Sequence, residues 1–162
     1  MENKMPNLYN LYRRDLTIQF SINTVAWMLI VLIGFYFADP TTMVVVPFVT
    51  LPIALIAFIV FALRYTRVMS ILRDGVVVKG FVEGFDHQER KEKDDYGRVK
   101  SRSFSYYVNV RYVINGETYK KTIRMPSSGF MFKIHDKQEV DLLYKESSPK
   151  TVLLKNVYFS NF

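Results

Sequence analysis

The two histidines are the first residues of this chain to test for catalytic chemistry. His87 lies in a strongly charged stretch, and His135 stands beside Asp136 in a segment typical of a turn. Nucleophilic catalysis needs a serine or cysteine in a recognisable motif, and the chain has no cysteine and no G-x-S-x-G sequence. Two histidines without carboxylates at ligand spacing do not predict a zinc site. The sequence therefore predicts no catalytic residue and no metal site.

Motifs that bind phosphates or cofactors are missing as well. The chain contains no G-x-x-x-x-G-K-[ST] and no G-x-G-x-x-G sequence. Gly75, Gly80 and Gly84 are surrounded by β-branched and aromatic residues, which indicates a bent strand and not a phosphate-binding loop. We expect a protein that has no cofactor and is not an enzyme.

Positive charge is the chemical feature that remains. Residues 64–162 carry 19 lysines and arginines against 12 aspartates and glutamates, so the whole net charge of +7 lies there. Such a surface is attracted to nucleic acid and to the anionic cytoplasmic leaflet of a membrane. Near that leaflet, each Lys or Arg contributes about 1 kcal/mol of binding free energy. The candidate lipid-facing residues are Arg98, Lys100 and Arg102. The candidate interaction surface, on the outward face of a hairpin, comprises Tyr107, Arg111, Lys120 and Arg124.

Two long uncharged stretches predict membrane-spanning helices. No charged side chain occurs for 23 residues between Leu16 and Ala38, nor for another 23 between Thr41 and Leu63. A helix rises about 1.5 Å per residue, so each stretch reaches about 34 Å and exceeds a hydrocarbon core of about 30 Å. We therefore expect a transmembrane helical hairpin over residues 16–63, with spans at 16–38 and 41–63, after a cytoplasmic segment of residues 1–15.

The distribution of lysine and arginine predicts the orientation of this hairpin. Lys4, Arg13 and Arg14 precede the first span, Arg64 and Arg67 follow the second, and the short connection has none. By the positive-inside rule, both termini lie in the cytoplasm. The lack of cysteine is typical of a reducing compartment.

Gln19 and Asn23 are polar residues of the first span that can form a helix–helix contact. They are four residues apart and therefore share one face of the helix. Amide side chains inside a membrane hydrogen-bond a neighbouring helix. That helix is either the second span of the same chain or a helix of another subunit, so a homo-oligomer stays open.

The stretch FSYYVNVRYVINGETYKKTI, residues 104–123, predicts a β-hairpin. Apolar residues alternate before Asn115-Gly116, a dipeptide that accepts the positive φ angles of a type I′ turn. This turn sets a register that pairs Tyr112 with Tyr119, Val108 with Ile123, Tyr106 with Met125, and Val110 with Lys121. Lys121 interrupts an otherwise apolar face.

Around this hairpin, residues 73–162 predict a small cytoplasmic β domain. Residues 75–85 and two later runs, EVDLLY and TVLLK, have the composition of strands. Residues 86–103 are highly charged and offer little to bury, so we expect a long, mobile hairpin loop there. Five or six short strands, with no amphipathic helix after Arg73, are typical of a small curled barrel of the OB or SH3-like kind.

The order of these features resembles a widespread bacterial domain-of-unknown-function family of membrane-anchored proteins with a small β domain. The family shows a G-x-V-x-G-x-V opening strand, a Y-x-V-x-Y strand with an N-G turn after a charged loop, and a V-x-V-x-Y strand before a proline. The matching residues are Gly75, Val78, Gly80, Val82, Tyr106, Val108, Val110, Tyr112, Gly116, Tyr119, Val140, Leu142, Tyr144 and Pro149. The resemblance covers roughly residues 73–155 and implies the β fold and a bacterial inner-membrane location. It brings no catalytic residue.

Together these features predict a non-enzymatic, membrane-anchored interaction module that presents its β domain to a protein partner or to the anionic membrane surface. One alternative is a subunit of an oligomeric channel or transporter, although spans without charge need several copies to form a polar pathway. The other is a membrane-tethered nucleic-acid-binding domain. A tethered domain meets lipid head groups constantly, whereas nucleic acid has to be recruited, so lipid contact or a purely solubilising role of the charges is favoured over nucleic acid.

Overall fold

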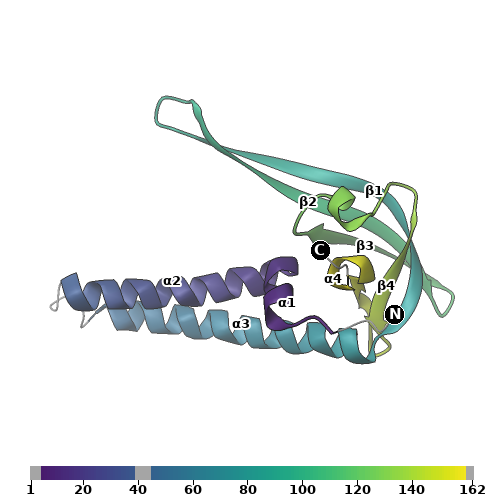
Figure 1. Ribbon diagram of the computed structural model, residues 1–162, viewed down its shortest axis with the longest axis horizontal. Helices are drawn as coiled ribbons and strands as arrows, with labels where there is room; N and C mark the ends of the chain where they lie inside the picture. Colours follow the sequence, from purple (N-terminus) through teal and green to yellow (C-terminus); the bar gives the residue numbers. More distant parts are fainter. Residues whose placement is uncertain (1–4, 39–44, 160–162) are drawn as a thin grey trace.

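The computed structural model describes residues 5–38 and 45–159. In chain order the elements are helices α1 (Leu8–Arg14), α2 (Leu16–Ala38) and α3 (Val46–Asp74), strands β1 (Val76–Lys93), β2 (Val99–Ile114) and β3 (Glu117–Met125), the 3-10 helix η2 (Gly129–Phe132), strands β4 (Glu139–Lys145) and β5 (Ser148–Leu154), and helix α4 (Lys155–Phe159). A hairpin of long helices extends from one end of the molecule, and the strands gather at the other (Figure 1).

Helices α2 and α3 lie side by side as an antiparallel hairpin. Within the described residues, these two helices are long and apolar enough to cross a membrane. Helix α2 has the predicted bounds, residues 16–38. It begins there because the Oδ1 atom of Asp15 accepts the backbone N–H groups of Thr17 at 3.0 Å and of Ile18 at 3.2 Å. The expected connection at residues 39–40 lies outside the described residues.

Helix α3 differs from the expected second span. Residues 41–44 of that span lie outside the described residues, and at its other end the helix continues past Leu63. The buried residues of this extension are Val68, Ile71 and Leu72. Their spacing of three and four residues forms an apolar stripe, which packs into the core beneath the sheet. The uncharged stretch therefore marks only part of the helix.

In the described part of the chain, five strands form one antiparallel sheet in the order β3-β2-β1-β4-β5. The predicted hairpin is confirmed, because Asn115 and Gly116 have φ angles of 51° and 83° and β2 pairs with β3 in the expected register. The rings of Tyr112 and Tyr119 stack across this register, with centroids 5.5 Å apart. Such cross-strand aromatic pairs stabilise a sheet.

The prediction of a closed barrel is wrong. Strands β3 and β5 are the edges of the sheet and do not pair with each other in the described residues. The sheet is nevertheless curved: β1 and β4 lie between β2 and β5 in the strand order, yet the Tyr112 hydroxyl on β2 donates to the Pro149 carbonyl on β5 at 3.1 Å. Helices cover its inner face instead of further strands, and one buried cluster joins Leu11 of α1, Val68 of α3 and Val157 of α4 to the sheet (Figure 1). Helices α1 and α3 precede the strands in the chain, and α4 has only five residues. The sequence of residues 73–162 alone therefore showed strands but no helix to cover them, which is the pattern of a barrel.

The charged segment of residues 86–103 is not the loop that its composition predicted. Strands β1 and β2 pair as far as Lys93 and Val99, and the chain turns only at residues 94–98. In that turn the Asp94 carboxylate accepts two backbone N–H groups, at 3.0 and 2.7 Å. A two-stranded ribbon in water can be polar on both faces, so it lacks the apolar alternation that marks a half-buried strand in a sequence. Figure 1 shows this ribbon extending beyond the rest of the sheet.

The core that α3 shares with the sheet predicts the effect of a small deletion. Val68 is 0 % exposed, so Val68→Ala removes fully buried methyl groups. We expect the free energy of unfolding to fall by about 2 kcal/mol. The matched control is Val77→Ala on β1, where the side chain is 46 % exposed and the loss should be much smaller. Thermal unfolding of the full chain in mild detergent measures both, and an unchanged midpoint for Val68→Ala would contradict a shared core.

Candidate functional site

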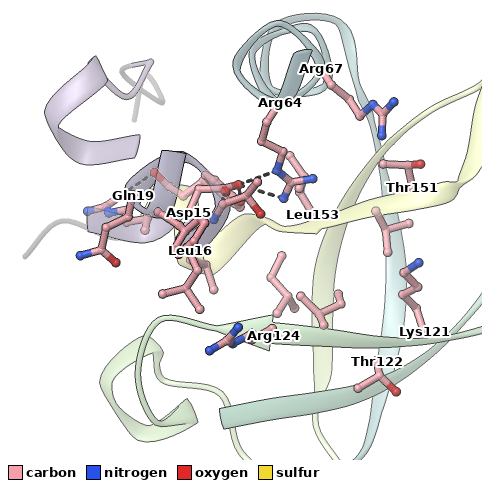
Figure 2. Close-up of a pocket in the computed structure, with 18 of the residues that line it drawn as sticks. Asp15, Leu16, Gln19, Arg64, Arg67, Lys121, Thr122, Arg124, Thr151 and Leu153 are labelled. Carbon is pink, nitrogen blue, oxygen red and sulfur yellow. Dashed lines mark hydrogen bonds and ion pairs between the residues drawn. The ribbon is translucent and has the colours of Figure 1, made fainter. Parts of the chain in front are cut away.

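A buried carboxylate, that of Asp15, joins the start of α2 to α3 and α4. Asp15 is 3 % exposed. Its Oδ1 atom caps α2, and its Oδ2 atom accepts hydrogen bonds from Arg64 Nε at 3.0 Å and from the Tyr158 hydroxyl at 2.8 Å. A second guanidinium nitrogen of Arg64 lies 2.8 Å from the same oxygen, and Figure 2 shows this ion pair. Both carboxylate oxygens are engaged, as a buried charge requires.

The sequence analysis missed this pair, although the chain carries a signal for it. Asp15 directly precedes the first uncharged stretch, and Arg64 directly follows the second. An antiparallel helical hairpin brings these two flanking positions to the same end. Opposite charges at those positions therefore predict an ion pair between the two helices.

The hydroxyl of Tyr158 is held in its neutral form by this site. Burial raises the pKa of the Tyr158 phenol above its ordinary value, and the nearby Asp15 carboxylate raises it further. A protonated phenol donates to Asp15, whereas a phenolate would repel it. Arg14 also donates a hydrogen bond to the Tyr158 carbonyl. Helix α4 is thus attached to the corner between α1 and α2 through both a side chain and the backbone.

A pocket of about 680 Å³ lies beside this network. Its walls come from the first turns of α2, from α3, from β3 and from the end of β5 with α4. Five residues of the lining are cationic, namely Arg14, Arg64, Arg67, Lys121 and Arg124, of which Arg124 directs its side chain to the outer face of the sheet. Among the described residues that line the pocket, Asp15 is the only carboxylate, and it already pairs with Arg64. In Figure 2 two of the arginines extend from helix α3, while Lys121 and Arg124 come from the strand on the other side.

Lys121 explains the interruption noted in the sequence of the hairpin. It pairs with Val110, which is buried, so the side chain of Lys121 projects from the inner face of the sheet. Two positions further along the strand, Ile123 packs against the core. A lysine on the inner face is expensive to bury, but here it lines the open pocket.

The predicted helix–helix residues Gln19 and Asn23 both line this pocket. The Oδ1 atom of Asn23 accepts a hydrogen bond from the Tyr12 hydroxyl of α1 at 2.8 Å, so its partner here is in the same chain but not on α3. Gln19 lies near Asp15 at the start of α2 (Figure 2). Contact of this face with another subunit stays a prediction.

The candidate interaction surface is brought together on one face of β2 and β3. Tyr107 pairs with Arg124 across the strands, and Arg111 pairs with Lys120. All four lie on the face opposite to the buried positions of β2. Arg111 and Lys120 lie 3.4 and 3.2 Å from the carboxylate of Glu83, which offsets part of their charge. That this face binds a partner stays a prediction.

The candidate lipid-facing residues Arg98, Lys100 and Arg102 lie at the far end of the ribbon, and all three are exposed. Tyr96, in the turn itself, is 86 % exposed. This end of the molecule therefore combines cations with an exposed aromatic ring. That combination is typical of contact with a membrane interface.

The two histidines, which are 48 residues apart in the sequence, line the same pocket in the structure. His87 lies within β1, and together with His135 and Asp136 it lines a second pocket of about 310 Å³. The backbone N–H of His135 donates to Oε1 of Gln138 at 2.9 Å. Within the described ranges, no group of three or more His, Cys, Asp or Glu side chains could hold a metal ion.

Comparison with known proteins finds no relative of this chain. No family model matches the chain, and neither a curated protein nor a solved structure matches it. The family resemblance of residues 73–155 stays a prediction from its motifs.

The contact between Tyr158 and Asp15 predicts a large loss of stability on removing one hydroxyl. Tyr158→Phe leaves a buried carboxylate oxygen with one donor fewer. Hydrogen bonds to charged groups contribute about 1.5–3 kcal/mol, so we expect the free energy of unfolding to fall by that amount. Thermal unfolding in mild detergent at neutral pH measures this loss.

Tyr12→Phe is the matched control, because it removes a tyrosine hydroxyl whose hydrogen bond to Asn23 is exposed to solvent. We expect this control to cost about 0.5 kcal/mol. Equal losses in the two variants would show that the Asp15 network does not hold α4 in place.

Proposed function

We propose that this chain is a non-enzymatic, membrane-anchored module of the bacterial inner membrane that holds its β-sheet against the anionic cytoplasmic leaflet. In this proposal α2 and α3 cross the membrane with both termini in the cytoplasm. The face of β2 and β3 that carries Arg111 and Lys120 is then free to meet a protein partner. The observation that carries the proposal is the direction of the β1–β2 ribbon.

The apolar surface of the helical hairpin supports the anchor. Phe20 on α2 is 73 % exposed and Phe48 on α3 is 78 % exposed. Many other large apolar side chains of the two helices are exposed as well. A soluble protein rarely exposes so large an apolar surface, whereas a bilayer covers it.

The ribbon extends on the same side of the sheet as this anchor. Figure 1 shows it leaving the sheet on the side where α2 and α3 extend, at an angle to the two helices. Strand β3 ends at Met125, opposite Tyr106, and β4 begins opposite Phe81, so the outer part of the ribbon has no further strand beside it. With the hairpin in a membrane, a ribbon of this direction carries Arg98, Lys100 and Arg102 toward the head groups.

The charges at this tip are suited to an anionic surface. Arg98 and Lys100 each contribute about 1 kcal/mol near such a leaflet, whereas the charge of Arg102 is partly offset by Glu89 at 3.6 Å. Tyr96 adds an aromatic ring suited to the interface. Of the two acidic residues in the turn, Asp94 already accepts hydrogen bonds from two backbone N–H groups. The balance of the tip therefore favours anionic lipid.

Nucleic acid has weaker support. The outward cations Arg111 and Lys120 share the carboxylate of Glu83, which reduces the charge that they offer to phosphates. The exposed aromatic ring beside them, that of Phe81, is in contact with the Arg111 guanidinium, which lies 6.0 Å from the ring centroid and competes with a stacked base.

A label at the ribbon tip tests the proposal. The chain has no cysteine, so Tyr96→Cys places a single spin label in the turn. In nanodiscs that contain anionic phospholipid, we expect the label to become accessible to a lipid-soluble relaxation agent. In discs of neutral lipid it should stay in water. The combined Arg98→Gln, Lys100→Gln and Arg102→Gln substitutions should abolish the difference, since they remove at least about 2 kcal/mol of attraction.

The control removes three lysines outside the ribbon, by Lys133→Gln, Lys137→Gln and Lys150→Gln. This variant has the same net charge as the tip variant and should keep the lipid-dependent contact. A label that stays in water in both lipid mixtures would overturn the proposed membrane contact of the ribbon.

A further inference from the structure

The pocket beside Asp15 lies where a bound lipid head group would be expected. One of its walls consists of Leu16, Gln19, Phe20 and Asn23, which belong to the first two turns of α2. In the proposed orientation these turns enter the bilayer from the cytoplasm, so the pocket lies at the depth of the phosphate groups. The exposed ring of Phe20 continues this wall toward the hydrocarbon.

Cations from separate elements converge on this pocket. Arg67 comes from α3, Lys121 projects from the inner face of β3, and Arg14 at the end of α1 donates to the Tyr158 carbonyl. Arg124 also borders the pocket, but its side chain turns to the opposite face of the sheet, where it donates to the hydroxyl of Ser105 at 3.2 Å. Because the one carboxylate in the described lining is committed to Arg64 and Tyr158, the lining keeps a net positive charge, with Arg67 and Lys121 directed to the pocket.

The environment of Arg14 is unfavourable for its charge. Burial lowers the pKa of the Arg14 guanidinium, and the neighbouring charge of Arg13 lowers it further. Both effects mean that the charged form is less favourable here than in water.

The polar groups of the lining suit a phosphate. Arginine presents several N–H donors in a plane and binds phosphate oxygens through pairs of hydrogen bonds. Lys121 supplies a point charge, and Gln19 and Thr151 supply neutral polar groups on the same lining. The volume of about 680 Å³ is within the usual range of small-molecule pockets and exceeds the need of a single ion.

We infer that this pocket binds a phosphate-bearing ligand, namely the head group of an anionic phospholipid whose acyl chains lie along α2 beside Phe20. The inference rests on the proposed membrane orientation but does not depend on the ribbon. It assigns to the helix–sheet junction a specific lipid, in contrast to the diffuse attraction at the ribbon tip.

The test uses the full chain, purified in a neutral detergent and depleted of lipid. Native mass spectrometry and thermal unfolding follow the titration of a short-chain phosphatidylglycerol, of the matching phosphatidylcholine, and of inorganic phosphate. We expect one phosphatidylglycerol to bind with a rise in the unfolding midpoint, and phosphatidylcholine to bind at least about tenfold more weakly.

The pocket variant combines Arg67→Gln with Lys121→Gln, because both residues are exposed and neither contacts Asp15. It should bind phosphatidylglycerol at least about tenfold more weakly than the unmodified chain. The matched control combines Arg111→Gln with Lys120→Gln, which removes two charges from the opposite face of the sheet. The control should bind as the unmodified chain does.

Each outcome decides the inference. Equal affinity for the two lipids, or an unchanged affinity in the pocket variant, would overturn it. Inorganic phosphate that binds as tightly as phosphatidylglycerol, and depends on the same two residues, would keep the phosphate site and overturn the lipid as its ligand. The ribbon variant should still bind phosphatidylglycerol here, so a failure of the ribbon contact is separable from a failure of the pocket.

Discussion

The charge of Asp15 is the constraint around which the two parts of this protein are arranged. A carboxylate that is buried where a helix begins must be compensated inside the protein. Its partners come from three separate places in the chain, the first turn of α2, Arg64 on α3 and Tyr158 on α4. Because α4 follows directly on the last strand, this one charge holds the sheet against the ends of the two long helices.

Holding the sheet in this position has a second effect, which is to gather cations that are distant in the sequence. Arg67 belongs to a helix that packs beneath the sheet, while Lys121 belongs to an edge strand. Like charges that face one hollow repel each other at short range. Their proximity therefore costs stability, and an anion bound in the pocket would reduce this cost.

The parts of the fold that were predictable from the sequence depend on local rules. The Asn115-Gly116 turn determined the register of β2 and β3, and the absence of charge determined the bounds of α2. The outer ribbon was missed because strands in water need no apolar alternation, and the barrel was wrong because α1 and α3 cover the sheet from earlier in the chain. The pocket required contacts between distant residues, although Lys121 on an apolar face was a visible sign of it.

An open sheet has exposed strand edges that can pair with another copy of the chain, whereas a closed barrel has none. Molecules that diffuse within one membrane meet repeatedly, and exposed strand edges can then pair and aggregate. In the described residues β3 and β5 each lack a neighbour on one side. Adjacent lysines at 120 and 121 and the missing N–H of Pro149 hinder pairing at these edges. The dense charge of residues 86–103 protects the ribbon in the same way, so the composition that disguised these strands also keeps neighbouring copies apart.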